Sequence, residues 1–376
     1  MIIQRNIEKI IFRNLVSNKV VVIAGARRTG KTVLLKESIK KVNEPYLFLN
    51  GEDIATHELL FRRSVINYKN LMGDVRLLII DEAQKINDIG LILKLMVDEI
   101  EGMKIIVTGS SSFDISNRLG EPLTGRKITY HLYPFSESEL MQIETKITKP
   151  ENLRDRLVYG NYPELTFLNG RENKEKYLKE LINSYLLKDK LSYENIRSSA
   201  KIIELLKLIS FQVGSEVSNN ELSRQLSISK TTVEKYLDLL TKVFILHKLS
   251  GFSRNLRKEV TKSSKWYFYD NGIRNGIINN FSQLSQRNDI GKLWENYIIS
   301  ERLKYQNDKQ YYSNNYFWRT YDKQEIDWIE EKDGNLSAYE LKWAEKKIKP
   351  PDGWLNSYPD SHFKVIHSDN YFNWVK

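Results

Sequence analysis

The sequence predicts an α/β protein of several domains, with a parallel β-sheet covered by helices at its start and a smaller α/β domain at its end. The chain has 376 residues and a mass of 44.3 kDa, which is long for a single core. In the first third, apolar runs of strand length alternate with helical patterns, as in a parallel sheet buried on both faces. Strand-like runs rich in Tyr, Trp and Ile return after residue 290.

The elements follow one another in an order that suggests four parts. Helical patterns separate the first strands, for example over 31–42 and 89–100, and a charged helical stretch covers 150–193. Three helices are expected within 200–242, followed by short strands. The strands are expected at 19–24, 45–49, 75–80, 104–107, 128–132, 244–252 and 266–269. We therefore expect a core at 1–145, a helical lid at 146–195, a helix-turn-helix module at 196–285 and a last domain at 286–376.

Composition excludes several kinds of protein. Without cysteine, the chain cannot form disulfides, Fe–S clusters or cysteine-ligated zinc sites, and five histidines leave little for a His-rich metal site. The sequence has no apolar run of about 20 residues, so we expect no membrane span, and its start lacks the order of a signal peptide. A cytoplasmic location is the expectation.

The net charge of +10 is unevenly distributed. Residues 191–280 carry 14 basic and 8 acidic side chains, whereas residues 286–376 carry 14 and 15. The excess of basic residues in the middle segment indicates an electropositive surface that could bind phosphate groups. A lysine-rich surface exposed only to solvent would have the same composition.

Residues 25–32 match the pattern G-x-x-x-x-G-K-[ST] between an apolar strand and a predicted helix. Glycines let successive backbone N–H groups point at phosphate oxygens, and the helix N-terminus adds partial positive charge. Lys31 is expected to bridge the β- and γ-phosphates and the Thr32 hydroxyl to ligate Mg²⁺. The predicted ATP-binding residues are Gly25, Ala26, Arg27, Arg28, Thr29, Gly30, Lys31 and Thr32.

A second apolar strand ends in Asp81 and Glu82. Carboxyl ends of parallel strands meet at one edge of a sheet, where ligands bind. We expect Asp81 to hold Mg²⁺ and Glu82 to polarise the attacking water. The paired acids and a strand between the two motifs resemble the additional-strand class of P-loop ATPases.

Further polar residues stand near the ends of the next strands. Thr108 and Ser110 end a strand at the same edge and are candidate sensors of the γ-phosphate, although turns also favour such residues. Arg126 and Arg118 precede the fifth strand. Either could contact the γ-phosphate of its own chain or of a neighbouring subunit.

Together these motifs resemble prokaryotic AAA-type P-loop ATPases that carry a PD-(D/E)xK nuclease-like domain at the C-terminus. The similarity covers nearly the whole chain. Ala26 and Asn161 depart from the family pattern, which often has proline and glycine there, and at Asn161 the pattern implies a left-handed turn. The resemblance rests on residues 25–32, 81–84, 108–111, 123–126, 132–135, 160–164 and 266–270.

The pattern of the middle segment predicts a winged helix-turn-helix. Ser218 with Glu221 predicts a capping box at one helix, and a short turn leads into a second helix that begins near Lys230. In DNA-binding modules of this kind the second helix reads the DNA, but the same fold also serves as a protein-docking module. The candidate DNA-contacting residues are Lys230, Thr231, Thr232 and Lys235 on the helix and Arg254, Arg257, Lys258, Lys262 and Lys265 in a basic wing.

Four C-terminal residues reproduce the PD-(D/E)xK pattern. Asp327 and Glu340-x-Lys342 lie on predicted strands, and Glu295 lies on a predicted helix. Asp327, Glu340 and Glu295 are the expected Mg²⁺ ligands with the Leu341 carbonyl, and Lys342 would steady the attacking hydroxide. Acids and lysines on adjacent strands also form ordinary salt bridges, and domains of this type can bind without cutting.

The leading hypothesis is an ATP- and Mg²⁺-dependent ATPase coupled to a DNA-associated winged helix and a nuclease-like domain. The alternative is an ATP-dependent protein-interaction switch whose nuclease-like domain is inactive, and a weaker third reading is a nuclease gated by ATP. The sequence leaves open the oligomeric state and whether Arg126 acts within its own chain.

Overall fold

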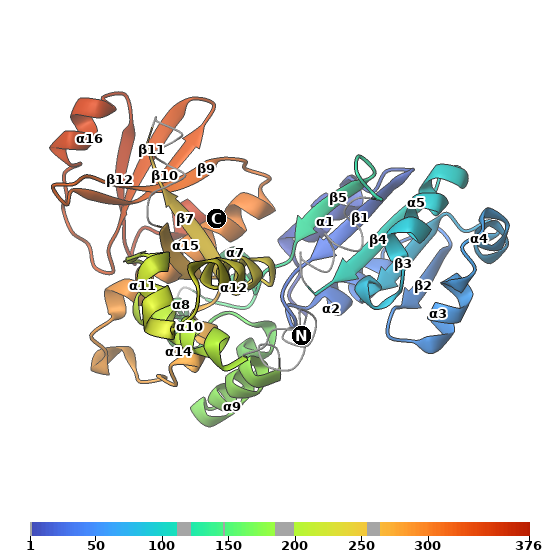
Figure 1. Ribbon diagram of the computed structural model, residues 1–376, viewed down its shortest axis with the longest axis horizontal. Helices are drawn as coiled ribbons and strands as arrows, with labels where there is room; N and C mark the ends of the chain where they lie inside the picture. The colour runs from blue at the N-terminus through green and yellow to red at the C-terminus, as the bar shows by residue number, and fades with distance from the viewer. Residues whose placement is uncertain (1, 111–121, 146, 185–198, 254–263) are drawn as a thin grey trace. The chain divides into compact units, whose positions relative to one another are not determined.

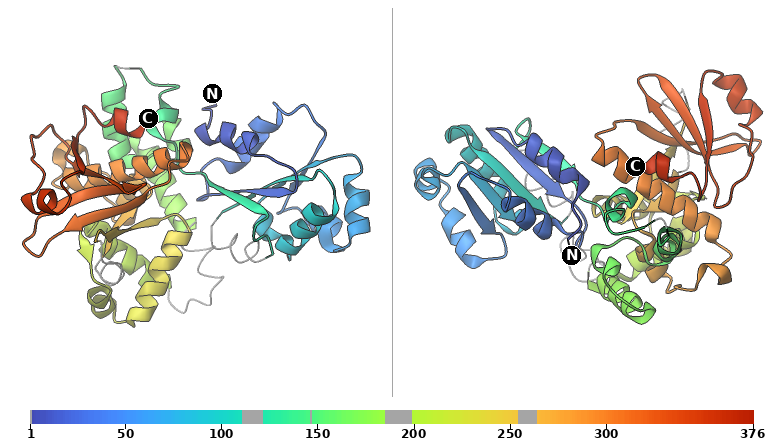
Figure 2. Two further views of the ribbon diagram at one scale, coloured as in Figure 1. Left: turned by 90° about the horizontal axis from the view of Figure 1, so that it is seen from above. Right: turned by 180° about the vertical axis from the view of Figure 1, so that it is seen from behind.

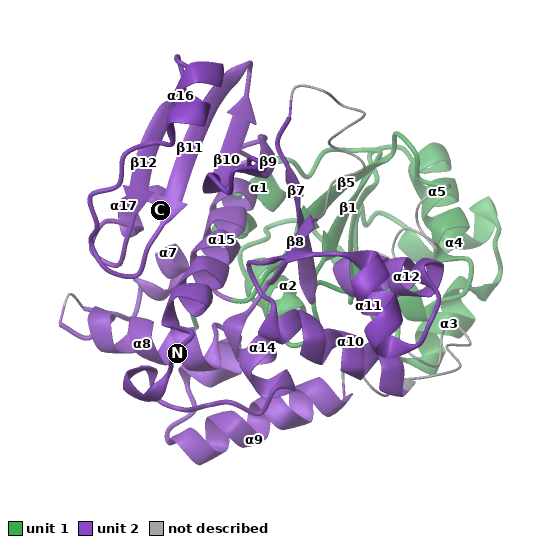
Figure 3. Ribbon diagram, turned by 60° about the vertical axis from the view of Figure 1, so that its left-hand side comes forward, with its two compact units in different colours: residues 1–134, 242–244 green, residues 135–241, 245–376 purple. Residues whose placement is uncertain are grey.

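The computed structural model describes residues 2–110, 122–145, 147–184, 199–253 and 264–376 (Figure 1). These residues divide into two compact units (Figure 3). Unit 1 comprises residues 1–134 and 242–244, and unit 2 comprises residues 135–241 and 245–376. The expected core boundary at residue 145 therefore falls about ten residues late, because Glu137 is buried among side chains of unit 2, including those of Arg156 and Tyr297.

Unit 1 contains one parallel sheet with the strand order β2-β3-β4-β1-β5. The strand inserted between the Gly25 and Asp81 strands is β4, whereas β2 lies at the edge. The strands are β1 (Lys19–Ala24), β2 (Tyr46–Asn50), β3 (Leu77–Asp81), β4 (Lys104–Gly109) and β5 (Lys127–His131). The helices are α1 (Asn6–Arg13), α2 (Lys31–Ile39), α3 (Ile54–Phe61), α4 (Val65–Met72) and α5 (Ile89–Glu99).

Helices cover both faces of this sheet. Side chains of a strand alternate between faces, so the continuous apolar run of β1 fills two cores. Val21 and Ile23 pack with Ile7 of α1 and Leu35 of α2. Val20 and Val22 are also fully buried, and α5 packs against β1 and β4. The predicted parallel sheet is confirmed.

Unit 2 contains a sheet with the strand order β12-β11-β10-β9-β7-β8-β6. The strands are β6 (Glu216–Val217), β7 (Leu246–Gly251), β8 (Ser264–Phe268), β9 (Asn314–Arg319), β10 (Glu325–Lys332), β11 (Asn335–Leu341) and β12 (His362–Ile366). Parallel pairing of β7 with β9 at Ser250 and Tyr316 joins the middle segment to the C-terminal strands, shown in orange and red from two further sides in Figure 2. The sequence predicts separate domains for these strands, whereas the structure joins them in one sheet.

Helices form the remainder of unit 2, and some of them pack against this sheet. They are α7 (Glu137–Leu140), α8 (Lys149–Tyr159), α9 (Arg171–Ile182), α10 (Ser199–Phe211), α11 (Asn219–Leu226), α12 (Lys230–Lys242), α14 (Asn271–Ile277), α15 (Ile290–Asp308), α16 (Asp352–Ser357) and α17 (Phe372–Val375). Ser218 precedes α11 as expected, but its side chain makes no capping hydrogen bond. Trp328, Trp354 and Trp374 are buried, while Trp343 is half-buried. No described helix is long and apolar enough to span a membrane.

A tight turn after α8 depends on Gly160. Its φ is +78°, and an added Cβ would lie 1.9 Å from Asp270 Oδ1. Asp270 Oδ1 caps α14 by accepting from Gly272 N at 2.8 Å, and Oδ2 accepts from Asn161 N at 2.7 Å. The left-handed residue is therefore Gly160, and the expectation of such a turn at Asn161 is wrong.

We expect Gly160→Ala to destabilise unit 2 by about 3 kcal/mol or more, since it combines left-handed strain with a steric clash. Gly170→Ala is the matched control, because Gly170 has φ +82° but its Cβ would meet nothing closer than 3.9 Å. Backbone strain alone should lower the free energy of unfolding of Gly170→Ala by about 1 kcal/mol. Urea unfolding of both variants measures the difference, and equal losses would show that the Asp270 contact is unimportant.

Candidate nucleotide-binding site

The loop between β1 and α2 has the form expected of a phosphate-binding loop. Gly25 packs so closely against the strand-end backbone that an added Cβ would lie 2.2 Å from Leu132 O. Gly30 has φ +93° and leads directly into α2, whose first residue is Lys31. Within the loop, Thr29 Oγ1 donates to Ala26 O at 2.8 Å. This hydrogen bond closes the loop just before α2 begins. The backbone N–H groups in the first turn of α2 therefore remain available to bind an anion.

Lys31 is 5 % exposed, and its ammonium is held by the loop itself. Lys31 Nζ donates to Gly25 O at 3.0 Å and to Ala26 O at 2.9 Å. Backbone carbonyls satisfy the buried cation in this structure, and phosphate oxygens offer stronger, charge-assisted contacts. Of the two loop arginines, Arg27 is half-buried and Arg28 is exposed with φ +61°.

The structure brings Thr32, Asp81 and Thr108 together. Thr32 Oγ1 donates to Asp81 Oδ2 at 2.6 Å, and Thr108 Oγ1 donates to Asp81 Oδ1 at 2.5 Å. Register places Ile23 beside Thr108 and Ile80 beside Val107, so all three strands end at one edge. A hydroxyl beside a carboxylate is the hard-oxygen pair that Mg²⁺ takes together with phosphates, so these residues fit the expected ion.

Glu82 follows Asp81 in a left-handed conformation, with φ +49°. Its backbone N–H donates to Thr108 Oγ1 at 2.9 Å, which ties the turn to β4. Gln84 Nε2 donates to Glu82 Oε2 at 2.5 Å and to Ser110 Oγ at 3.2 Å. Gln84 therefore orients the Glu82 carboxylate and connects it to Ser110. Gln84 belongs to the sequence motif that begins at Asp81, but its place in that motif does not indicate this role.

Arg5 is a second residue that sequence reasoning missed. Its side chain is buried, and Nη1 donates to Thr29 O at 2.9 Å while Nη2 donates to Tyr133 O at 2.6 Å. One guanidinium thus fixes the loop to the segment that follows β5. No motif surrounds Arg5, so only the fold could identify it.

Arg126 does not join this site. It precedes β5, where Val20 N donates to its carbonyl at the amino end of β1, whereas the phosphate loop follows the carboxyl end. Its guanidinium pairs with Asp98 at 2.6 Å. The expected contact with a γ-phosphate of the same chain is therefore wrong, because five residues of strand separate the two edges. Arg118 lies outside the described residues.

The C-terminal residues singled out from the sequence also come together. Asp327 Oδ2 accepts from Leu341 N at 2.9 Å and from Lys342 Nζ at 3.4 Å, and Lys342 Nζ lies 2.6 Å from Glu340 Oε1. Glu295 Oε1 accepts from Tyr267 OH at 2.6 Å. Burial, and then the Asp327 charge, raises the pKa of Glu295 to about 7.

These acids are not arranged as the expected metal site. Across the described residues, no group of three or more His, Cys, Asp or Glu side chains could hold a metal ion. Lysines occupy the positions between the acids: Lys342 pairs with Glu340 and Asp327, and Lys265 with Glu325. The three acids thus do not form a ready metal-binding group in the described part of the chain, and their role as Mg²⁺ ligands stays a prediction.

Lys265 also corrects the expected basic wing. It is 1 % exposed and lies 3.8 Å from Glu295 Oε1, so it cannot grip a DNA backbone. Burial lowers the pKa of Lys265, but the charges of Glu295, Asp327 and Glu325 outweigh it and raise the pKa overall. The other four wing residues, Arg254, Arg257, Lys258 and Lys262, lie outside the described residues.

Family models match three successive regions of the chain. Residues 17–141 match an AAA domain, and residues 150–284 and 290–365 match two different domains of unknown function. The uncharacterized protein MJ1544 of Methanocaldococcus jannaschii is 27% identical over 326 residues, which cover 80% of this chain and 69% of that protein. The uncharacterized protein Rv2008c of Mycobacterium tuberculosis is 26% identical over 330 residues, covering 86% and 70%.

A solved structure is also similar, the Walker-type ATPase PABY2304 of Pyrococcus abyssi. It shares 14% identity with a TM-score of 0.49, and the match covers 74% of this chain and 96% of that one. Residues 17–141 are similar in sequence to an AAA domain, and their parallel sheet, loop and Asp81 have the arrangement of a P-loop fold.

Proposed function

We propose that the chain is a Mg²⁺-dependent ATPase. The observation that carries the proposal is the meeting of Thr32, Asp81 and Thr108 beside the loop that holds Lys31. Phosphoryl transfer needs positioning and charge neutralisation more than covalent chemistry, and this edge offers both. Bound Mg²⁺ would neutralise charge on the triphosphate, held by the Thr32 hydroxyl and the Asp81 carboxylate.

Each residue of the site has a defined task in this proposal. Lys31 exchanges its contacts with the loop carbonyls for phosphate oxygens. Glu82, oriented by Gln84, accepts a hydrogen bond from the attacking water and aligns it with the terminal phosphate. Arg5 keeps the loop in place through Thr29 O, so it is a positioning residue and does not touch the nucleotide.

Replacing Lys31 by alanine should weaken ATP binding at least about tenfold, because charge-assisted hydrogen bonds to phosphate are lost. Titration of a fluorescent ATP analogue measures the affinity. Lys36→Ala, an exposed lysine on the same helix, is the control and should bind like the native chain. Unchanged affinity and turnover in Lys31→Ala would exclude nucleotide binding at this loop.

Glu82→Gln should separate binding from hydrolysis. Turnover should fall at least about 100-fold because the group that aligns water loses its basicity, while ATP affinity should change by no more than about threefold. Phosphate release measures the turnover, and nucleotide titration of the same sample measures the ATP affinity. The exposed neighbour Glu52→Gln serves as the control. Equal turnover in both variants would remove Glu82 from the mechanism.

A second proposal concerns DNA contact by unit 2. The order α10, β6, α11, α12, β7 and β8 supports a winged-helix interpretation, in which α12 would enter the major groove. Lys230, Thr231 and Lys235 on α12 are exposed, while Thr232 is partly covered and its N–H donates to Ser229 Oγ at 3.1 Å. Lys230 also lies 3.9 Å from Glu234, a weak exposed pair that DNA phosphates could replace.

We expect salt-sensitive binding to duplex DNA, weakened about tenfold by combined Lys230→Ala and Lys235→Ala, with a shallower dependence on salt. Fluorescence anisotropy at several salt concentrations measures both. Lys207→Ala, an exposed change on α10, is the control. Failure to bind DNA would favour the alternative, a nucleotide-dependent switch that contacts another protein.

A further inference from the structure

Unit 2 has a cavity of about 480 Å³ where the end of α10, the segment after α14 and the start of α15 come together. Sites for small molecules usually have volumes of roughly 300–1,000 Å³, so a ligand of that class fits. The apolar part of the wall consists of Ile278 and Phe211, which is 62 % exposed. The polar part of the wall is formed by Arg274, Asn280, Asn288, Asp289, Gly291 and Lys292.

The wall contains a buried guanidinium with an incomplete set of partners. The side chain of Arg274 is 3 % exposed. Its Nε donates to Ser210 O at 2.9 Å, and its Nη1 donates to Asn275 Oδ1 at 3.0 Å and to Asp289 Oδ2 at 2.7 Å. Arg274 Nη2 has no acceptor in the described part of the chain, and it is not sealed off from solvent. This nitrogen is therefore left to donate to a ligand in the cavity.

Asp289 does not balance the charge of Arg274 by itself, because it is also paired with Arg287. Arg287 Nε donates to Asp289 Oδ1 and Arg287 Nη2 donates to Asp289 Oδ2, both at 2.8 Å, which is a bidentate ion pair. Burial lowers the pKa of Arg274, and the shared charge of Asp289 does not restore it, although a guanidinium stays charged at neutral pH. Together with Lys292, three cations and one carboxylate stand at this end of α15.

The start of α15 adds further donors to the wall. Leu293 N donates to Asp289 O at 3.0 Å, which is the first hydrogen bond of the helix. The backbone N–H groups of residues 290–292 have no acceptor among the described residues. Lys292 Nζ donates to Phe211 O at the long distance of 3.4 Å, which leaves donors of the ammonium open. The open groups are donors and the carboxylate oxygens are already used, so this wall favours an anion.

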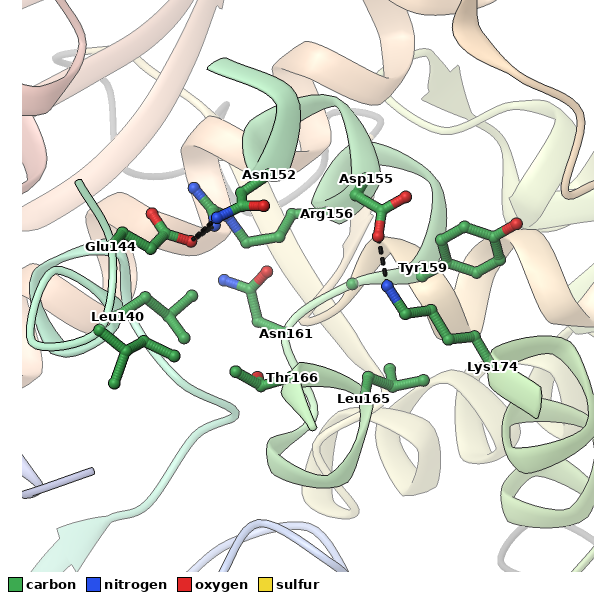
Figure 4. A pocket seen from close by; sticks show the side chains of 12 residues that line it. Leu140, Glu144, Asn152, Asp155, Arg156, Tyr159, Asn161, Leu165, Thr166 and Lys174 are labelled. Atoms are coloured by element: carbon green, nitrogen blue, oxygen red, sulfur yellow. Dashed lines mark hydrogen bonds and ion pairs between the residues drawn. The ribbon is translucent and has the colours of Figure 1, made fainter. Parts of the chain in front are cut away.

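A smaller cavity of unit 2, with about 120 Å³ beside Gly160, shows the contrast (Figure 4). On its wall Lys174 is paired with Asp155, and Arg156 is paired with Glu144. Each cation of that wall has a carboxylate of its own, so the wall has no excess of positive charge.

We propose that the cavity at the start of α15 binds the phosphate group of a small phosphate monoester. Arg274 Nη2, the Lys292 ammonium and the Gly291 N–H would donate to the phosphate oxygens, while Phe211 and Ile278 would pack against the organic part. A monoester carries a charge of about −1.5 to −2 at pH 7, which suits two cations that have no carboxylate of their own. The phosphodiester of a nucleic acid carries only one charge. All of these residues belong to unit 2, so the proposal does not depend on nucleotide binding by unit 1.

Calorimetric titration of the full chain with phenyl phosphate tests the proposal. Benzoate, with a single negative charge, and uncharged benzyl alcohol are the comparison ligands. We expect saturable binding of phenyl phosphate, at least about tenfold tighter than that of benzoate, and a crystal structure of the soaked protein with the phosphate beside Arg274. Equal affinities for the three ligands would overturn the proposal. Displacement of phenyl phosphate by an unphosphorylated DNA duplex would assign the cavity to the DNA backbone instead, which also overturns it.

Two variants separate this signal from binding at the loop of unit 1. Lys292→Ala should weaken binding of phenyl phosphate at least about tenfold, because a cationic donor is lost. Gly291→Leu should abolish binding by filling the cavity, since a Cβ at Gly291 would meet nothing within 4 Å. Lys309→Ala, at the other end of α15, is the matched control and should bind normally.

The three substituted residues are exposed, whereas loss of the buried Arg274 would endanger the fold, so Arg274 is left unchanged. Circular dichroism shows whether each variant is folded. Native affinity for phenyl phosphate in folded Lys292→Ala and Gly291→Leu would place the ligand elsewhere and contradict the proposal.

Discussion

The parallel register of β1, β3 and β4 is the constraint on which the candidate nucleotide site depends. Because Ala24 is level with Gly109 and Ile80 with Val107, the phosphate loop, the two acids and the Thr108 hydroxyl are delivered to one edge of the sheet. A shift of one residue would turn every side chain of the strand to the other face. The buried aliphatic run of β1 and its neighbours fixes this register, so core packing in unit 1 also sets the site geometry.

Much of unit 1 could be predicted because its chemistry depends on local patterns. The loop residues 25–32 and the acids at the end of β3 are contiguous in sequence, and the parallel sheet follows from apolar strands between helices. Arg5 and Gln84 act through contacts that no spacing rule contains, since Arg5 meets a carbonyl 128 residues away. The predicted contact between Arg126 and a γ-phosphate fails for another reason. The position of Arg126 next to β5 in the sequence does not show which end of that strand lies near the candidate site.

Unit 2 was harder to predict because its charged residues are buried in pairs. In sequence analysis a charged residue is expected to be exposed to solvent. Glu301, Arg302 and Lys304 of α15 are instead buried, and their side chains are hydrogen-bonded within unit 2. Burying such groups is favourable only with complete partners, and those partners come from distant segments. The order of acids and lysine around Asp327 was visible in the sequence, whereas the insertion of Lys265 among them was not.

The pairing of β7 with β9 has a consequence for how the protein can be dissected. The regions 150–284 and 290–365 match separate family models, which would suggest expressing them as independent fragments. The sheet is continuous across that boundary, so a cut there would remove β9 from β7. The backbone N–H and C=O groups on that edge of β7 could then pair with a strand of another molecule. Fragments ending near residue 285 would be prone to self-association, and soluble truncations should retain the whole of unit 2.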